Sequence, residues 1–266
     1  MAIDYVVHLN CTPKNTFGVD GLLDRLKAGA RAREIIRLYR ENGDNRPPSE
    51  MGFEFARNLP DGEEEIAVVM VQDMLDQAAE LEPLIPYCAD CPANVLNRPF
   101  GCYGSINYPI SSAAEKWLLE QLPSNREPLL WLLLRESLKQ NDGHPVEPLR
   151  AGGVYFEDRA VRGREFSEYI ASANQVFQML FLFGHIQPIH AGMLLLFFNA
   201  VPREDVESTD ITRLLDGTLP QHEKEERFPF VLQQTDEDDS SISEFKTFFK
   251  ALHRAWMLDV ALLLDV

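Results

Sequence analysis

Alternation of hydrophobic and polar residues predicts several short strands in the first half of the chain. Each predicted strand is rich in β-branched and aromatic residues and is bounded by turn-forming residues. An Asp61-Gly62 pair between the second and third strands favours a hairpin turn. The predicted strands are 3–11, 51–57, 66–71 and 103–108.

Helical spacing of apolar residues dominates the remainder of the chain. Two helices are predicted to start at capping boxes, one formed by Ser112 with Glu115 and one by Ser241 with Glu244. The last helix is expected to continue almost to the end of the chain. The predicted helices are 19–41, 72–84, 112–122, 127–139, 163–181 and 241–266.

Together these elements predict the α+β class, with a small N-terminal β-sheet and helices followed by a mainly helical body. Residues 1–123 form the α+β region that carries the cysteines, and residues 124–266 form the mainly helical region. The later helices have strong apolar faces that need a partner to cover them. We therefore expect the two regions to share one core.

The stretch 170–202 contains no Asp, Glu, Lys or Arg, and its part 179–198 is strongly apolar. A membrane-spanning helix needs about 20 apolar residues. Pro188, however, lies in the middle of this stretch and would leave two short helical halves. The segment therefore predicts a buried helical hairpin, and no membrane partner is expected.

Composition predicts a folded, acidic protein. Hydrophobic residues make up 45% of the 266 positions and charged residues 25%, and the formal net charge is -17. Such a surface repels the phosphate backbone, which argues against a general nucleic-acid binder and favours a basic protein partner. Basic residues cluster between Arg25 and Arg40, where we interpret them as a solvated helix face and not as a binding patch.

The first residues show no basic start, long apolar run or small-residue cleavage site, so no secretory signal is expected. This predicts a cytoplasmic location, where thiols stay reduced.

Three of the four cysteines lie within a short, turn-rich segment. Cys88 and Cys91 form a Cys-x2-Cys pair, and Cys102 follows after a loop containing Pro92, Pro99 and Gly101. Two thiolates three positions apart bind one ion readily, and such a loop brings a third onto it. Zinc in structural sites prefers four ligands, so the remaining cysteine, Cys11, is predicted to complete the site.

Alternatives to this zinc site stay open. His8 is the reserve fourth ligand, although its spacing from Cys11 places the two on opposite faces of a strand. Four thiolates can also ligate an iron–sulfur cluster, although zinc is the favoured metal. The other interpretation is that Cys11 is a small buried apolar residue and that the remaining three cysteines fall in one loop by chance; the metal site is favoured over it.

Other residues give weaker indications of chemistry. His185 and His190 flank Pro188 and are candidates for a second metal, a haem or an acid–base pair in a dry pocket; the simpler interpretation is two hydrogen-bonded histidines at a helix junction. No phosphate-binding glycine loop, nucleophile elbow or zinc-protease helix is present in the sequence. An enzymatic function is therefore not favoured.

Three functions are consistent with the sequence. The first is a metal-binding protein in which zinc, held by four cysteines in a structural role, supports protein–protein contacts. The second is an iron–sulfur enzyme or redox sensor that uses the same cysteines. The third is an acidic inhibitor or immunity-type protein that binds a basic partner and needs no metal.

Overall fold

The computed structural model describes residues 2–58, 64–166 and 169–265. It confirms the α+β class, because 53% of the chain is helical and 13% lies in strands. The chain forms two compact units, which do not coincide with the ranges 1–123 and 124–266. Unit 1 comprises Met1–Leu9, Pro92–Asn97 and Gly101–Val266, and unit 2 comprises Asn10–Cys91 and Arg98–Phe100.

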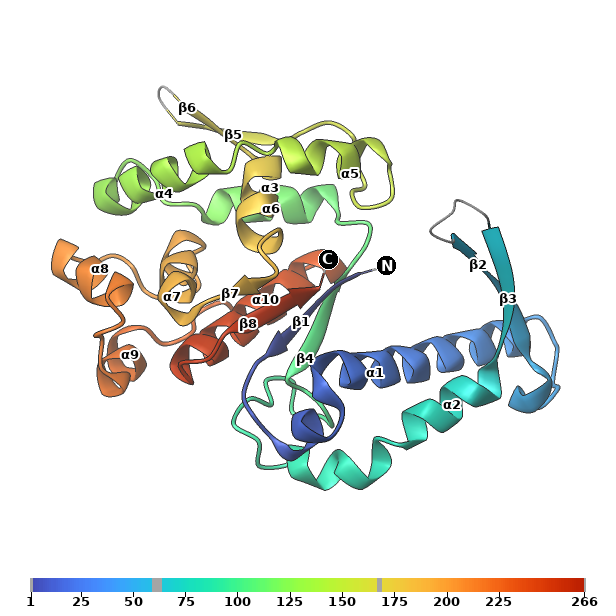
Figure 1. Ribbon diagram of the computed structural model, residues 1–266. Coiled ribbons are helices and arrows are strands. Elements are labelled where there is room, and N and C mark those ends of the chain that lie inside the picture. Colours follow the sequence, from blue (N-terminus) through green and yellow to red (C-terminus); the bar gives the residue numbers. More distant parts are fainter. Residues whose placement is uncertain (1, 59–63, 167–168, 266) are drawn as a thin grey trace. The chain divides into compact units, whose positions relative to one another are not determined.

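Unit 1 is built on a four-stranded antiparallel sheet with the order β4-β1-β8-β7 (Figure 1). The last strand of the chain, β8, lies between the first strand and β7, although helical spacing predicted a helix over the same residues. The sheet therefore takes strands from both ends of the chain. Its strands are β1 (Ala2–Val7), β4 (Tyr103–Asn107), β7 (His185–Ile186) and β8 (Leu262–Asp265).

Helices make up most of the rest of unit 1. The predicted helix 163–181 is only half correct, because its first part forms a β-hairpin of β5 (Gly163–Phe166) and β6 (Tyr169–Ser172). The helices are α3 (Ser112–Gln121), α4 (Pro128–Gln140), α5 (Glu147–Ala151), α6 (Ala173–Phe181), α7 (Pro188–Phe197), α8 (Ser208–Leu215), α9 (Gln221–Arg227) and α10 (Ser240–Met257), with a 3-10 turn, η3, at His144–Val146.

The core of unit 1 is aromatic and centres on α10. Phe248 is fully buried and contacts the rings of Tyr5, Phe181 and Phe249 at centroid distances of 5.4, 5.1 and 5.4 Å. These contacts join the sheet to α6 and α10. Burial of one such side chain contributes about 1.5–3 kcal/mol.

The apolar stretch 179–198 forms two short helices that end and begin around β7, as Pro188 predicted. Met179 and Phe181 at the end of α6, and Leu195 in α7, are buried. Of the helices in the described ranges, none has both the length and the apolar composition needed to cross a membrane.

Gly104 on β4 allows the Tyr5 ring of β1 to lie directly over it, because the two residues are paired in register. A Cβ atom at Gly104 would lie 2.4 Å from atoms of that ring. We expect Gly104→Ala to lower the free energy of unfolding by about 1–3 kcal/mol through overpacking. Urea unfolding followed by circular dichroism measures this loss; an unchanged midpoint would show that the ring moves aside freely.

Unit 2 pairs two helices with a β-hairpin. A buried cluster formed by Ala28, Ala32, Met51, Val71 and Met74 holds these elements together. Helix α1 is kinked at Gly18, whose φ is 73°; the proposed Asp61-Gly62 turn lies outside the described residues. The elements are α1 (Thr12–Glu41), η1 (Pro48–Glu50), β2 (Gly52–Asn58), β3 (Glu64–Met70), α2 (Val71–Ala79) and η2 (Glu82–Cys88).

Candidate functional site

The four cysteines do not form the predicted metal centre. Cys11 precedes α1, Cys88 ends η2 and Cys91 follows shortly after, all in unit 2. Cys102 belongs to unit 1, directly before β4. Across the described ranges, no group of three or more His, Cys, Asp or Glu residues is placed to hold a metal ion, and these four cysteines form no disulfide. The predicted function as a four-cysteine zinc protein is therefore wrong. The iron–sulfur alternative relied on the same four cysteines and is left without a ligand group.

The cysteines differ from one another in burial and in local backbone structure. Cys88 and Cys102 are each only 8% exposed. Burial raises the pKa of the Cys88 thiol, although a hydrogen bond from the backbone of Phe100 opposes the change. Cys11 does not end a strand, because β1 stops at Val7 and Cys11 occupies the position before the first turn of α1.

The histidines that the sequence singled out lie at the surface. His185 on β7 and His190 on α7 are both exposed, so neither occupies the dry pocket that an acid–base pair would need. His8, the reserve metal ligand, is also exposed; its backbone N–H donates to the carbonyl of Ala261 at 2.9 Å.

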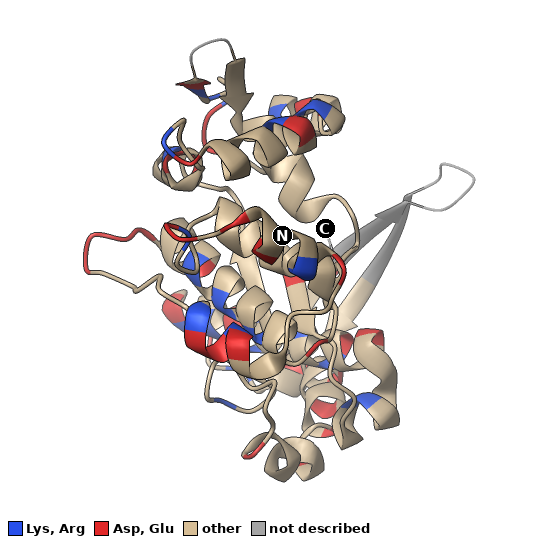
Figure 2. Ribbon diagram, turned by 90° about the vertical axis from the view of Figure 1, so that its left-hand side faces the viewer, with Lys and Arg blue, Asp and Glu red and all other residues tan. Residues whose placement is uncertain are grey.

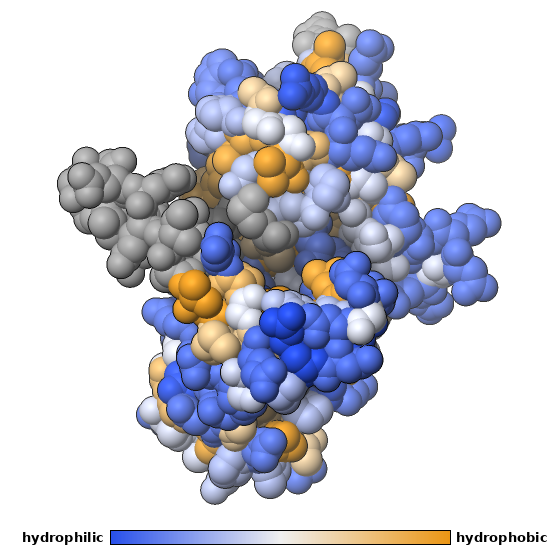
Figure 3. Space-filling model, turned by 90° about the vertical axis from the view of Figure 1, so that its right-hand side faces the viewer, coloured by the Kyte–Doolittle hydropathy of each residue, from blue (hydrophilic) through white to orange (hydrophobic). Residues whose placement is uncertain are grey.

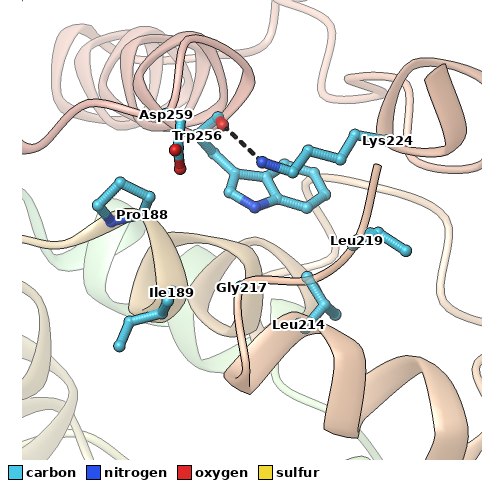
Figure 4. Close-up of a pocket in the computed structure, with 8 residues that line it drawn as sticks. All are labelled: Pro188, Ile189, Leu214, Gly217, Leu219, Lys224, Trp256 and Asp259. Carbon is cyan, nitrogen blue, oxygen red and sulfur yellow. Dashed lines mark hydrogen bonds between the residues drawn. The ribbon is translucent and has the colours of Figure 1, made fainter. Parts of the chain in front are cut away.

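A different feature of unit 1 has the composition of a binding site. A small pocket opens where the starts of α7 and α9 meet the ends of α8 and α10 (Figure 4). Its empty volume is about 220 Å³, including solvent at the mouth. The pocket is lined by Pro188, Ile189, Leu214, Gly217, Leu219, Lys224, Trp256 and Asp259.

Close helix packing forms the inner wall of this pocket. Gly192 on α7 has no side chain, which lets Leu214 and Trp256 lie directly against that helix. A Cβ atom at Gly192 would lie 2.7 Å from Leu214 and 3.2 Å from the indole nitrogen of Trp256. The Trp256 side chain is therefore fixed in place with only 3% of its surface exposed.

Two cation–carboxylate pairs hold α8 and α9 beside the pocket. Arg213 of α8 donates to both carboxylate oxygens of Glu223, at 2.8 and 2.7 Å. Arg227 of α9 does the same to Asp210, at 2.6 and 2.8 Å. Bidentate pairs of this kind fix orientation, so the pocket is preformed.

Lys224 supplies a positive charge to one side of the pocket. Its ammonium group donates to the carbonyl oxygen of Trp256 at 3.2 Å and lies 5.3 Å from the centroid of the indole ring. Burial lowers the pKa of Lys224, and the negative charge of Asp259 partly opposes that shift. An ammonium group has three donors, so Lys224 has donor capacity beyond this one hydrogen bond.

Asp259 supplies a negative charge on the other side (Figure 4). It directly follows the end of α10, where its N–H donates to the carbonyl of Trp256 at 3.2 Å. Its φ is 53°, in the left-handed region that favours glycine or asparagine at a helix end. A carboxylate also interacts unfavourably with the negative end of the helix dipole. Asp259 therefore reduces stability in two ways.

Trp256 adds a hydrogen-bond donor. Its indole nitrogen is turned toward the chain at Gly217 (Figure 4). The pocket thus combines apolar walls with two donors, Trp256 and Lys224, and one acceptor, Asp259.

Sequence reasoning missed this site because the site is assembled from four separate elements. Trp256 was assigned to the apolar stripe of the last helix, and Asp259 to the interior of the same helix. The one available signal was the acidic Asp259 between the apolar residues Leu258 and Val260, which marks the end of α10.

Comparison with known proteins adds no relative to these observations: the chain matches no protein-family model, no curated protein and no solved structure.

Proposed function

We propose that this protein acts by binding a basic protein partner through unit 1. The observation that carries the proposal is an imbalance in how unit 1 uses its charged side chains. Its basic side chains are mostly engaged within the fold, whereas many of its carboxylates face solvent alone. The unpaired charges in the described part of unit 1 are therefore mainly negative, and a basic partner is the complementary one.

The engaged cations serve two structural purposes. Some hold carboxylates, as Lys246 does with Asp238 at 2.6 Å. Others hold carbonyl groups at helix ends, as Arg164 does with those of Leu119 and Leu122. Figure 2 shows basic residues beside acidic ones along the helices. In the described part of unit 1, the cations whose side chains have neither an ion pair nor a hydrogen bond are Arg126, Arg159, Lys250 and Arg254.

The carboxylates of unit 1 that make neither an ion pair nor a hydrogen bond outnumber the cations that make neither, and they are exposed. They lie on several elements, and two of them, Asp216 and Glu226, are close in sequence to residues that line the pocket. Exposed carboxylates in the described part of unit 1 that make neither an ion pair nor a hydrogen bond are Glu165, Asp205, Asp216, Glu226, Asp236, Glu237 and Asp259.

The same charge argues against nucleic acid as the partner, because exposed carboxylates repel phosphates. A wide apolar interface is not favoured either on the face drawn in Figure 3, where hydrophobic residues lie in small groups among hydrophilic ones. Charge complementarity therefore supports a basic protein segment better than either alternative.

Fluorescence anisotropy with defined peptides tests the proposal. The probe is a labelled peptide with a leucine between short runs of lysine, and its control has glutamate in place of lysine. We expect only the lysine peptide to bind, and its affinity to fall about tenfold from about 0.01 M to about 0.1 M salt, where the screening length drops from roughly 30 Å to roughly 10 Å. Equal binding of both peptides would refute the proposal.

Matched variants locate the interaction on unit 1. Glu226→Gln, two residues after Lys224 on α9, should weaken binding of the lysine peptide by roughly twofold to fivefold at low salt. Glu165→Gln removes an equal charge from the β5 strand and should leave affinity unchanged. Equal losses from both variants would indicate a general effect of net charge without a defined docking face.

A further inference from the structure

We propose that two copies of this chain exchange strand β8, so that the β8 of each copy completes the sheet of the other. Exchange of an identical element between two molecules is domain swapping, and it produces a dimer without a new kind of interface. The inference is independent of the proposed basic partner, because it rests on the sheet of unit 1 and on the turn that leads into β8.

Strand β8 lies between β1 and β7 and joins them into one sheet (Figure 1). Its residues from Leu262 to Asp265 pair with β1, and Leu262 and Leu263 also pair with β7. The N–H of Leu264 donates to the carbonyl of Gly184 at 2.8 Å. Without β8, β7 would lose the strand that it pairs with and β1 would expose an apolar edge, so the position has to be filled.

The position between β1 and β7 suits an apolar strand in one register. Leu262 is fully buried between Val7 of β1 and Ile186 of β7. Leu264 is 8% exposed and lies opposite Tyr5, which is 4% exposed. A basic segment would have to bury charge there at a large cost. The β8 of a second copy presents the same leucines in the same register, so the occupant that fits is a second copy of this chain.

A short turn connects α10 to β8. Only four residues lie between the end of the helix and the start of the strand. Within them, the N–H of Asp259 donates to the carbonyl of Trp256 at 3.2 Å, and the N–H of Val260 donates to that of Ala255 at 3.0 Å. This is the hydrogen-bond pattern of a Schellman turn, whose left-handed position is usually occupied by glycine.

Asp259 occupies that left-handed position and makes the turn unfavourable. Its φ of 53° costs more for a residue with a Cβ atom than for glycine. Its carboxylate also lies at the negative end of the α10 dipole. Both penalties are relieved when the turn opens into an extended connection that carries β8 to a second molecule. Short connections under strain favour domain swapping in this way.

Substitutions of Asp259 in the full chain test the exchange. Each protein is concentrated, equilibrated near its urea midpoint and returned to buffer, and its mass is measured by light scattering after size-exclusion chromatography. Asp259→Gly relieves the turn, so we expect its dimer dissociation constant to be about tenfold higher than that of the unsubstituted protein. Asp259→Pro cannot adopt a positive φ, so we expect it to be dimeric at concentrations at which Asp259→Gly is monomeric.

A disulfide distinguishes an exchanged strand from side-by-side association. Val7 and Leu262 are paired across β1 and β8, and residues paired in this way are close enough for a disulfide. After oxidation of Val7→Cys/Leu262→Cys, a non-reducing gel should show a covalent dimer in the Asp259→Pro background and a monomer in the Asp259→Gly background. Asp259→Pro without the added cysteines is the control and should give no covalent dimer.

The outcomes separate exchange from its alternatives. Equal dissociation constants for the unsubstituted protein and Asp259→Gly would overturn the proposal. An Asp259→Pro dimer without interchain disulfides would also overturn it, because intact sheets would then be associating. If Asp259→Pro does not fold, the other two proteins decide: a tighter dimer of the unsubstituted protein supports exchange, and the absence of a dimer from both overturns it.

Discussion

Replacing Arg150 with methionine is expected to lower the free energy of unfolding of unit 1 by about 3–5 kcal/mol. Arg150 and Glu115 form an ion pair in which each side chain is only 3% exposed. Removing the cation would leave the carboxylate buried without a charged partner. Because domains are usually stable by only about 5–15 kcal/mol, this is a large share of the total.

The expected loss is large because Arg150 joins several elements. From α5 it donates to Glu115 on α3, to the side chain of Asn174 on α6 at 2.8 Å and to the carbonyl of Asp158 at 2.8 Å. Its guanidinium also lies 3.9 Å from the centroid of the Phe156 ring. Methionine would preserve part of the packing but none of these hydrogen bonds.

Tryptophan fluorescence during urea unfolding measures this loss, because all three tryptophans (Trp117, Trp131 and Trp256) lie in unit 1. The double variant Glu115→Leu/Arg150→Met is the control. Replacing both members of a buried pair with apolar residues is often neutral, so the double variant should recover most of the stability. A double variant as unstable as Arg150→Met alone would contradict the assignment of the loss to an unpaired charge.

The pH dependence of Arg150→Met gives a second readout. Burial raises the pKa of Glu115 in the folded protein, and Arg150 opposes that shift. Without Arg150 the folded pKa should rise further above the unfolded value. The folded state then binds more protons, so the variant should gain stability as the pH falls through the folded pKa of Glu115. A flat profile would show that Glu115 is solvated in the variant.

Hydrophobic patterning predicted elements correctly where local and tertiary preferences agree. The strand at 103–108 and the strand pair at 51–57 and 66–71 appear as β4, β2 and β3. The hairpin of β5 and β6 was missed because its aromatic residues also fit a helical spacing. Phe166 instead stacks on Trp131 of α4, with ring centroids 4.1 Å apart.

Both predicted capping boxes were displaced because several cap-forming residues stand next to each other. Ser111 caps α3 and Asp239 caps α10, in place of Ser112 and Ser241. Tertiary contacts determine which of these residues caps the helix. Ser241 accepts a hydrogen bond from the N–H of Ser111 at 3.2 Å, which takes it away from capping. Sequence alone shows which residues are able to cap a helix but not which of them a distant element engages.

The candidate site could not be predicted from the sequence for a related reason. Cysteines that lie close together in sequence suggested convergence on an ion, whereas the structure uses Cys88 and Cys102 as largely buried thiols. The pocket, in contrast, brings together residues from α7 to the end of α10 that share no spacing. Its polar members, Lys224 and Asp259, come from separate elements that line the same pocket.

Leu262→Ala is expected to lower the free energy of unfolding of unit 1 by about 2–5 kcal/mol, because it leaves a cavity in the centre of the sheet. Leu262 is fully buried on β8, where it pairs with Val7 of β1 on one side and Ile186 of β7 on the other. Removing its side chain therefore weakens contacts on both neighbouring strands.

Leu263→Ala is the matched control, and it separates the strand from the predicted helix. In a continuous helix, Leu263 would share the buried stripe of Trp256 and Val260, and Leu262 would face away from it. In the strand, Leu263 is on the opposite face from Leu262 and is only partly buried. We therefore expect Leu263→Ala to cost about 1 kcal/mol, measured by tryptophan fluorescence in urea. A larger loss from Leu263→Ala than from Leu262→Ala would mean that the chain end is helical and that the assignment of β8 to the sheet is wrong.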